Sequence, residues 1–311
     1  MAVFTALSAA DADVVCATWR LGTLRSLEPT PHGIENSNFF IVSEDEGRQR
    51  EWVLTISERP FAPTALETLA RLEAAGLPVP MPQPDRHGNL IAYIKGQPAL
   101  LARRFPGKHP EHPSPAQCAA IGGFLTRMHH ETAGLDAPGH PRDARWIAGA
   151  AERHRPHLGP RARQRLDEAL AVVATAEQRR DWHTLPAGIV HGDLFRDNAL
   201  FDGGEDGQEL SAVIDFHHAA RAPLLFDLAV TANDWCTEAN GHFDQARLAA
   251  LERAYWGVRP PSDAERGAWP DMTVLAALRF WLARLEIPRK PPLEMEEILA
   301  ARLRDAAPLT S

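Results

Sequence analysis

A short stretch of the chain carries three polar residues whose types and spacing suit phosphoryl transfer. Asp193 and Asn198 lie in the segment HGDLFRDN, and Asp215 comes near the end of the apolar run SAVIDF. A loop carboxylate such as Asp193 can accept the proton of a hydroxyl that attacks a phosphate. Amide and carboxylate oxygens, as in Asn198 and Asp215, are ligands that Mg²⁺ prefers. These residue types therefore predict a general base and a metal site for transfer of a phosphoryl group.

Two predicted strands must position these residues. Residues 199–201 leave the Asp193 loop as one strand, and residues 211–216 form the other. A tight hairpin turn centred on Asp206-Gly207 would place Asn198 opposite Asp215. The glycines just before this turn allow a wider loop, so the register stays open. Either register brings an amide oxygen and a carboxylate to one end of the hairpin.

Two neighbouring residues are expected to support the loop. His191, between a strand and a glycine, is more typical of a structural hydrogen-bonding residue than of a proton shuttle. Asp227 begins an apolar helix. Its carboxylate either interacts with the positive end of the helix dipole or braces the catalytic loop through hydrogen bonds.

The rest of the chain divides into a part with predicted strands and helices and a later part that is mostly helical. In the part up to residue 104, one helix is expected to begin at Ser8 and a second to cover about 62–75. The strands expected there cover 38–43, 51–57, 90–94 and 98–104. After the proline- and glycine-containing break at 103–112 the pattern is mostly helical, starting at Ser114. We therefore predict an α+β fold with a small antiparallel-sheet domain (1–104) and a helical domain (105–311). Further helices are expected near 144–155, 160–179, 224–236, 243–256, 272–286 and 294–304.

Composition narrows the functional classes. The net charge of −8 argues against nucleic acid as a partner, because nucleic-acid binding needs a basic surface. The three cysteines are scattered and form neither a disulfide framework nor a metal-binding spacing, which favours a cytoplasmic location. The sequence shows neither a signal peptide nor an apolar run long enough to span a membrane. No pattern indicates an oligomeric state.

The motif HGDLFRDN followed by IDF resembles the aminoglycoside phosphotransferase and choline kinase superfamily, whose members are related to protein kinases. Additional segments narrow the resemblance to the homoserine kinases of that superfamily. They are GIENSNFFI (33–41), LPVPMPQPDRHGNL (77–90), LPAGIVHGDLFRDNALF (185–201), NDWC (233–236), ALRFWLARL (277–285) and the PLE near the end (292–294).

This resemblance implies a bilobal, kinase-like fold that binds ATP. It implies that Asp193 is the catalytic base and that Asn198 and Asp215 bind Mg²⁺. The adenine would lie against the hinge near Arg103 to Gly107, with Arg104 and Phe105 among its contacts. The reaction would be phosphorylation of the side-chain hydroxyl of L-homoserine, a step toward threonine.

The expected phosphate-binding elements depart from the superfamily pattern. The loop that covers the phosphates contains Gly33 without further glycines, so Asn36 and Ser37 would have to assist the backbone amides. Thr55 stands where the ATP-binding lysine is expected. Arg59, just after the same strand, either supplies the missing charge or is a solvated residue at the end of the strand.

Homoserine is a zwitterion, so its site needs an anionic partner for the ammonium group and a cationic partner for the carboxylate. Asp234 and Glu238 are candidates for the first role and Arg279 for the second, although each is also compatible with a surface charge.

Other acceptors stay open at this point. An aminoglycoside site would require an acidic patch, and a choline site an aromatic cage, for which Trp235, Trp256 and Trp281 are available although tryptophan at helical spacing is more typical of a core. A nucleotide-binding pseudokinase would explain the missing lysine, but it would have no use for Asp193.

Overall fold

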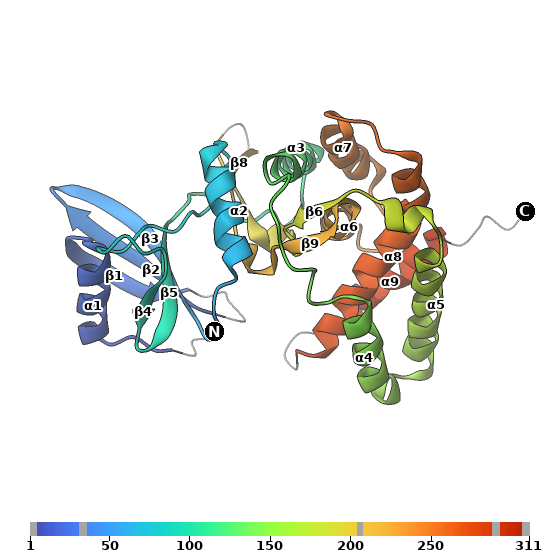
Figure 1. The fold of residues 1–311 in the computed structure, drawn as a ribbon, viewed down its shortest axis with the longest axis horizontal. Coiled ribbons are helices and arrows are strands. Elements are labelled where there is room, and N and C mark those ends of the chain that lie inside the picture. The colour runs from blue at the N-terminus through green and yellow to red at the C-terminus, as the bar shows by residue number, and fades with distance from the viewer. Residues whose placement is uncertain (1–4, 31–35, 204–207, 288–292, 307–311) are drawn as a thin grey trace, which may run out of the picture. The chain divides into compact units, whose positions relative to one another are not determined.

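The computed structural model describes residues 5–30, 36–203, 208–287 and 293–306. The chain forms two compact units (Figure 1). The first contains Met1–Pro106 together with Ser211–His217, and the second contains Gly107–Leu210 and His218–Ser311. The sequence predicted one division, between residues 104 and 105. In the structure the first unit is made of two segments, because residues 211–217, which include Asp215, also belong to it.

The first unit is built on a five-stranded antiparallel sheet with the order β1-β2-β3-β5-β4. Two of its hairpins turn through Glu46-Gly47 and Lys95-Gly96, whose residues all have positive φ, as two-residue hairpin turns require. Each turn joins two strands that the sequence predicted. The strands are β1 (Thr23–Pro29), β2 (Asn36–Asp45), β3 (Arg48–Ser57), β4 (Ala92–Ile94) and β5 (Gln97–Arg103).

One face of this sheet packs against helix α1 (Ala9–Trp19), which begins after Ser8 as predicted and has a capping box formed by Ser8 and Asp11. Val15 and Trp19 of the helix join alternate residues of the strands in one buried cluster. The strand β1 was not predicted, because it is a half-exposed edge strand that ends in proline and contains an irregularity in its pairing. The unit also contains α2 (Pro63–Ala74), which ends before Gly76 as expected.

The second unit is mainly helical (Figure 1). Its interior is formed largely by α6 and α8, which pack against each other and are buried over most of their lengths. α8 begins earlier than the sequence indicated, at a capping box of Ser262 and Glu265, and contains Pro270. The helices are α3 (Pro115–Glu131), α4 (Ala144–His154), α5 (Pro160–Glu177), α6 (Leu224–Trp235), α7 (Gln245–Trp256), α8 (Asp263–Leu285) and α9 (Leu293–Ala306).

Short strands interrupt these helices where the catalytic motif was expected. β6 (Ala187–Val190) pairs with β9 (Ala220–Pro223), and β7 (Ala199–Asp202) pairs with β8 (Glu209–Val213). The hairpin between β7 and β8 is closed by a 3.1 Å hydrogen bond from the amide of Gln208 to the carbonyl of Gly203. The predicted turn at Asp206-Gly207 lies outside the described residues.

In the described part of the chain, none of the helices is both long and apolar enough to cross a membrane.

Candidate active site

The catalytic loop, residues 191–198, connects β6 to β7. Its chain reverses through Gly192, which has a φ of +78°, and ends in a single 3₁₀ turn at Arg196–Asn198. The side-chain Nδ2 of Asn198 donates to the backbone carbonyl of Asp193 at 2.7 Å and lies 3.5 Å from its carboxylate. With its nitrogen committed to the loop, Asn198 keeps its amide oxygen for another ligand.

Asp227, on α6, holds the beginning of this loop. Its carboxylate is fully buried and accepts hydrogen bonds from the amides of His191 (2.7 Å) and Gly192 (2.8 Å). His129 of α3 lies 3.1 Å from the same carboxylate, and its other ring nitrogen is 3.0 Å from the hydroxyl of Tyr255. Of the two roles considered for Asp227, these contacts favour the brace.

Asp234, at the other end of α6, holds the end of the loop through Arg196. Its carboxylate accepts hydrogen bonds from the amide (2.7 Å), Nε (3.1 Å) and Nη2 (3.4 Å) of Arg196. Burial raises the pKa of Asp234 to about 6, against the opposing effect of Arg196. Arg196 contacts both oxygens of Asp234, so the structure gives this carboxylate a role in holding the loop. Its binding of the acceptor's ammonium group stays a prediction. Glu238, the other candidate, is exposed and accepts a 3.2 Å hydrogen bond from Asn240.

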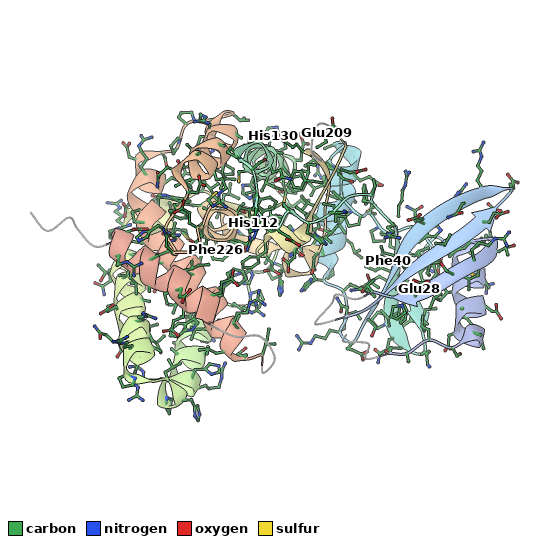
Figure 2. The ribbon with its side chains drawn as sticks, turned by 180° about the vertical axis from the view of Figure 1, so that it is seen from behind. Glu28, Phe40, His112, His130, Glu209 and Phe226 are labelled. Carbon is green, nitrogen blue, oxygen red and sulfur yellow. The ribbon has the colours of Figure 1, made fainter. Side chains whose placement is uncertain are left out.

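Arg279, the predicted carboxylate-binding residue, reaches the catalytic loop from α8. Its side chain is buried, with its guanidinium 4.0 Å above the ring of Phe226, which Figure 2 labels inside the helical unit. Its Nη2 donates to the carbonyl of Gly192 at 3.3 Å and lies 2.7 Å from Nε2 of His140. Burial, assisted by the positive charge of Arg142, lowers the pKa of Arg279 to about 9, while Asp193 and Asp227 act in the opposite direction.

His140 and Arg142 were not identified from the sequence. Both lie in an irregular segment before α4, where no motif marks them. Their proximity to Arg279 depends on contacts between segments 139 residues apart, so no local pattern could have revealed it.

The residues expected to contact phosphates lie in the first unit. Ser37 is buried, and its hydroxyl accepts a 2.9 Å hydrogen bond from the amide of Thr5. Thr55 of β3 pairs with Asn38 on β2 and alternates with the buried Leu54 and Ile56, so it faces away from the α1 side of the sheet. Asn36 begins β2, and the predicted Gly33 lies outside the described residues.

Three further expected nucleotide contacts differ in their surroundings. Arg59 is exposed, and its amide donates to the hydroxyl of Ser57 at 3.3 Å. Arg104 is also exposed, but its guanidinium forms an ion pair with Glu51 at 3.1 Å and lies 4.0 Å above the ring of Phe40, a residue labelled in Figure 2. Phe105 is half-buried. The structure therefore gives Arg104 a local structural partner, while Arg59 projects toward solvent.

Asp215 occupies an unusual backbone position. Its φ is +69°, a left-handed conformation that is rare for residues other than glycine and that concentrates at functional sites. The carboxylate is 40% exposed and contacts Nδ1 of His217, while the intervening Phe216 is buried. Asp215 thus presents an accessible carboxylate, and Asn198 an uncommitted amide oxygen. Such hard oxygen ligands fit Mg²⁺.

Comparisons with known proteins agree with this chemistry. The model of the phosphotransferase enzyme family matches residues 26–261. A homoserine kinase of Cupriavidus pinatubonensis is 40% identical, with 99% of each chain covered. A homoserine kinase of Pseudomonas aeruginosa is also 40% identical, over 92% of this chain and 88% of that protein.

Solved structures share the fold at low sequence identity. The amicoumacin kinase hAmiN in complex with AMP-PNP, Ca²⁺ and Ami has a TM-score of 0.70 at 16% identity, covering 95% of this chain and 91% of that one. A microcompartment-associated aminopropanol kinase has a TM-score of 0.69 at 17% identity, covering 96% of both chains. The predicted α+β, kinase-like fold is confirmed. The family model and the full-length relatives together establish that the chain belongs to the phosphotransferase enzyme family and, within it, to the homoserine kinases.

Proposed function

We propose that this protein transfers the γ-phosphoryl group of ATP to the side-chain hydroxyl of L-homoserine, giving O-phospho-L-homoserine for threonine biosynthesis. The observation that carries this proposal is the 40% identity to a curated homoserine kinase over 99% of both chains. The similarity includes the catalytic loop and its supporting helices rather than one motif alone, because the match extends across nearly the whole chain.

In the proposed mechanism, Asp193 orients the homoserine hydroxyl and accepts its proton as the oxygen attacks the γ-phosphorus. Phosphoryl transfer requires little covalent chemistry from the protein, so positioning supplies much of the rate enhancement. The loop is held accordingly: Asp227 binds two of its amides, Arg279 one of its carbonyls, and Asp234 binds Arg196. These contacts support the proposal, because they hold the backbone on either side of the base without help from a substrate.

Asn198 and Asp215 are the proposed ligands of a divalent ion, for which we propose Mg²⁺. Such an ion neutralises the charge of the phosphate oxygens when it is bound with the nucleotide. The hydrogen bond from Asn198 Nδ2 to the Asp193 carbonyl supports this role, because it orients the amide so that its oxygen is available.

The alternative function, a choline kinase with an aromatic cage, is not supported by the two most buried tryptophans. Trp235 and Trp281 are fully buried, and the indole nitrogen of Trp235 donates to the carbonyl of Leu194 at 3.1 Å. They belong to the core, as tryptophans at helical spacing usually do, and are not placed to enclose an acceptor's ammonium group.

The proposal is tested by comparing kcat/KM at saturating MgATP for L-homoserine, choline, ethanolamine and 4-hydroxybutyrate. A site that pairs both charges of homoserine leaves one of its own groups unpaired when an acceptor lacks the carboxylate or the amine. We expect L-homoserine to be preferred by at least ~10²-fold over each of the others. Comparable values for homoserine and any one of them would contradict the homoserine assignment while leaving the kinase assignment in place.

A further inference from the structure

His140, beside the catalytic loop, is surrounded by hydrogen-bond donors. Its Nδ1 accepts the backbone amide of Arg142 at 3.0 Å, and its Nε2 lies 2.7 Å from Nη2 of Arg279. A backbone N–H can only donate, and an arginine side chain has no acceptor. The ring is also kept neutral, because burial and the two arginines lower the pKa of His140 to about 3.

A neutral imidazole has one N–H and one acceptor nitrogen, so it cannot accept both of these hydrogen bonds. If Nδ1 accepts from the Arg142 amide, Nε2 carries the proton and its N–H faces the N–H groups of Arg279. The other tautomer only transfers the conflict to the Arg142 amide. In either state, the N–H of the His140 ring faces another N–H group, that of Arg279 or that of the Arg142 backbone, without an acceptor between them.

Arg279 has a second N–H group that lacks an acceptor. Its Nε is buried and has no hydrogen-bond partner, and the side chain as a whole is only 4% exposed. The carbonyl of Gly192, at 3.3 Å from Nη2, is the acceptor that the catalytic loop provides. Unpaired buried donors are costly, so they are rare in native proteins and call for a functional explanation, such as a group that binds there.

Arg142 adds another positive charge to this place. Its charge lowers the pKa of both His140 and Arg279, which shows that the groups lie within electrostatic range. The Arg142 side chain is half-buried, with its guanidinium 5.6 Å from the ring of Trp146. The guanidinium of Arg279 and the ring of His140 therefore lie beside Gly192, next to the proposed base, and the backbone amide of Arg142 joins them through His140.

We propose that Arg142, His140 and Arg279 form the binding site for the carboxylate of the acceptor. A carboxylate supplies the acceptor oxygens that this donor cluster lacks, and its planar shape matches the donor geometry of a guanidinium group. The cluster is joined to Asp193 through Gly192, so an acceptor whose carboxylate binds here has its hydroxyl close to the base. The inference rests on the proposed function and deepens it, because Arg142 and His140 become determinants of acceptor specificity.

The test compares L-homoserine with L-homoserinol, in which an alcohol replaces the carboxylate, on the wild-type enzyme and on Arg142→Ala. We expect Arg142→Ala to lower kcat/KM for homoserine by ~10²-fold, mainly through KM, because a charge-assisted contact is lost. For homoserinol, which lacks the carboxylate, the change should stay below ~3-fold, and KM for ATP should not change. Arg145→Ala, which removes an exposed arginine of α4 only a few residues away, is the matched control and should behave as wild type.

Equal losses for homoserine and homoserinol, or no loss for either, would overturn the inference and leave the proposed function standing. Absence of wild-type turnover on homoserine would remove both. If Arg142→Ala does not fold, as judged by circular dichroism, Arg142→Lys provides the same comparison. It keeps one charge but not the planar fork, so homoserine should again lose more than homoserinol, by ~10-fold.

Discussion

The catalytic loop in the second unit and the proposed nucleotide-contacting residues in the first unit are built in opposite ways. The loop is held by the buried ionisable side chains of Asp227, Asp234 and Arg279, each of which forms hydrogen bonds to the loop backbone or to Arg196. On the strand of the first unit, Thr55 replaces the expected lysine, and the nearest candidate cation, Arg59, is exposed. From this comparison we propose that the protein holds the proposed base through buried side chains and leaves much of the phosphate charge to be neutralised by a bound ion.

Removing a proposed metal ligand should have the largest effect. Because no buried cation of the described strand replaces the lysine, we expect Asp215→Ala to reduce turnover by more than ~10⁴-fold at any Mg²⁺ concentration. Asn198→Ala should raise the Mg²⁺ concentration needed for half-maximal rate. The measurement is the rate as a function of Mg²⁺ at fixed ATP. A wild-type curve for either variant would exclude that residue as a ligand.

Asp193→Asn tests the proposed base on the catalytic loop. The amide keeps the shape of the side chain but cannot accept the hydroxyl proton, so kcat should fall by ~10²- to 10⁴-fold. Folding and ATP affinity should be nearly unchanged, since neither depends on the proton transfer. Steady-state kinetics and an ATP-binding titration measure the two parts. Near wild-type kcat would remove Asp193 from the mechanism.

Asp227→Ala tests whether the brace is energetically important. Its removal leaves the buried amides of His191 and Gly192, and the side chain of His129, without their shared acceptor. We expect the free energy of unfolding to fall by about 3 kcal/mol, the scale for breaking a buried hydrogen-bonded charge. Urea denaturation measures it. Asp167→Ala is the control, because Asp167 of α5 pairs with Arg155 at the surface and should change stability by less than ~1 kcal/mol.

The neutral state of His140 predicts a pH dependence of stability. The pKa of His140 is about 3 in the folded protein against an ordinary value of 6.5. Between these values the unfolded chain binds the proton and the folded protein does not, so this group favours folding less and less as pH decreases below 6.5. The contribution approaches ~1.4 kcal/mol per pH unit. His140→Gln should flatten the stability profile between pH 4 and 6 by about this slope, and an unchanged profile would mean that His140 is protonated in the folded protein.

Local signals in the sequence were sufficient for most of the fold. Capping boxes at Ser8 and Ser114 and the glycine turns placed helices and hairpins close to their observed bounds. The HGDLFRDN motif placed the catalytic loop between two short strands. The edge strand β1 was missed because its alternation is weak and its burial is incomplete.

Residue roles set by distant partners were harder to predict. Asp234 has the charge expected of an ammonium ligand, but the sequence did not reveal that its carboxylate also binds Arg196, 38 residues earlier. The same limit applies to His140, whose environment is created by Arg279 on α8. Charge and spacing can therefore nominate a residue, but only the fold shows which partner has already taken its hydrogen bonds.

The smallest effect is expected for Arg59, which tests whether a side chain of the first unit neutralises part of the phosphate charge. If Arg59 supplies the charge of the absent lysine, Arg59→Ala should raise KM for ATP by ~3- to 5-fold and leave KM for homoserine unchanged. The effect is modest because an exposed, mobile arginine is screened by solvent and ions, unlike a buried lysine on a strand. For the same reason the difference between variant and wild type should shrink as the salt concentration rises from 50 to ~500 mM. Arg71→Ala, which removes an exposed arginine of α2, controls for the loss of net charge. An ATP KM that is unchanged at low salt would mean that no cation of this strand end assists, leaving the bound ion and the backbone amides to neutralise the phosphates.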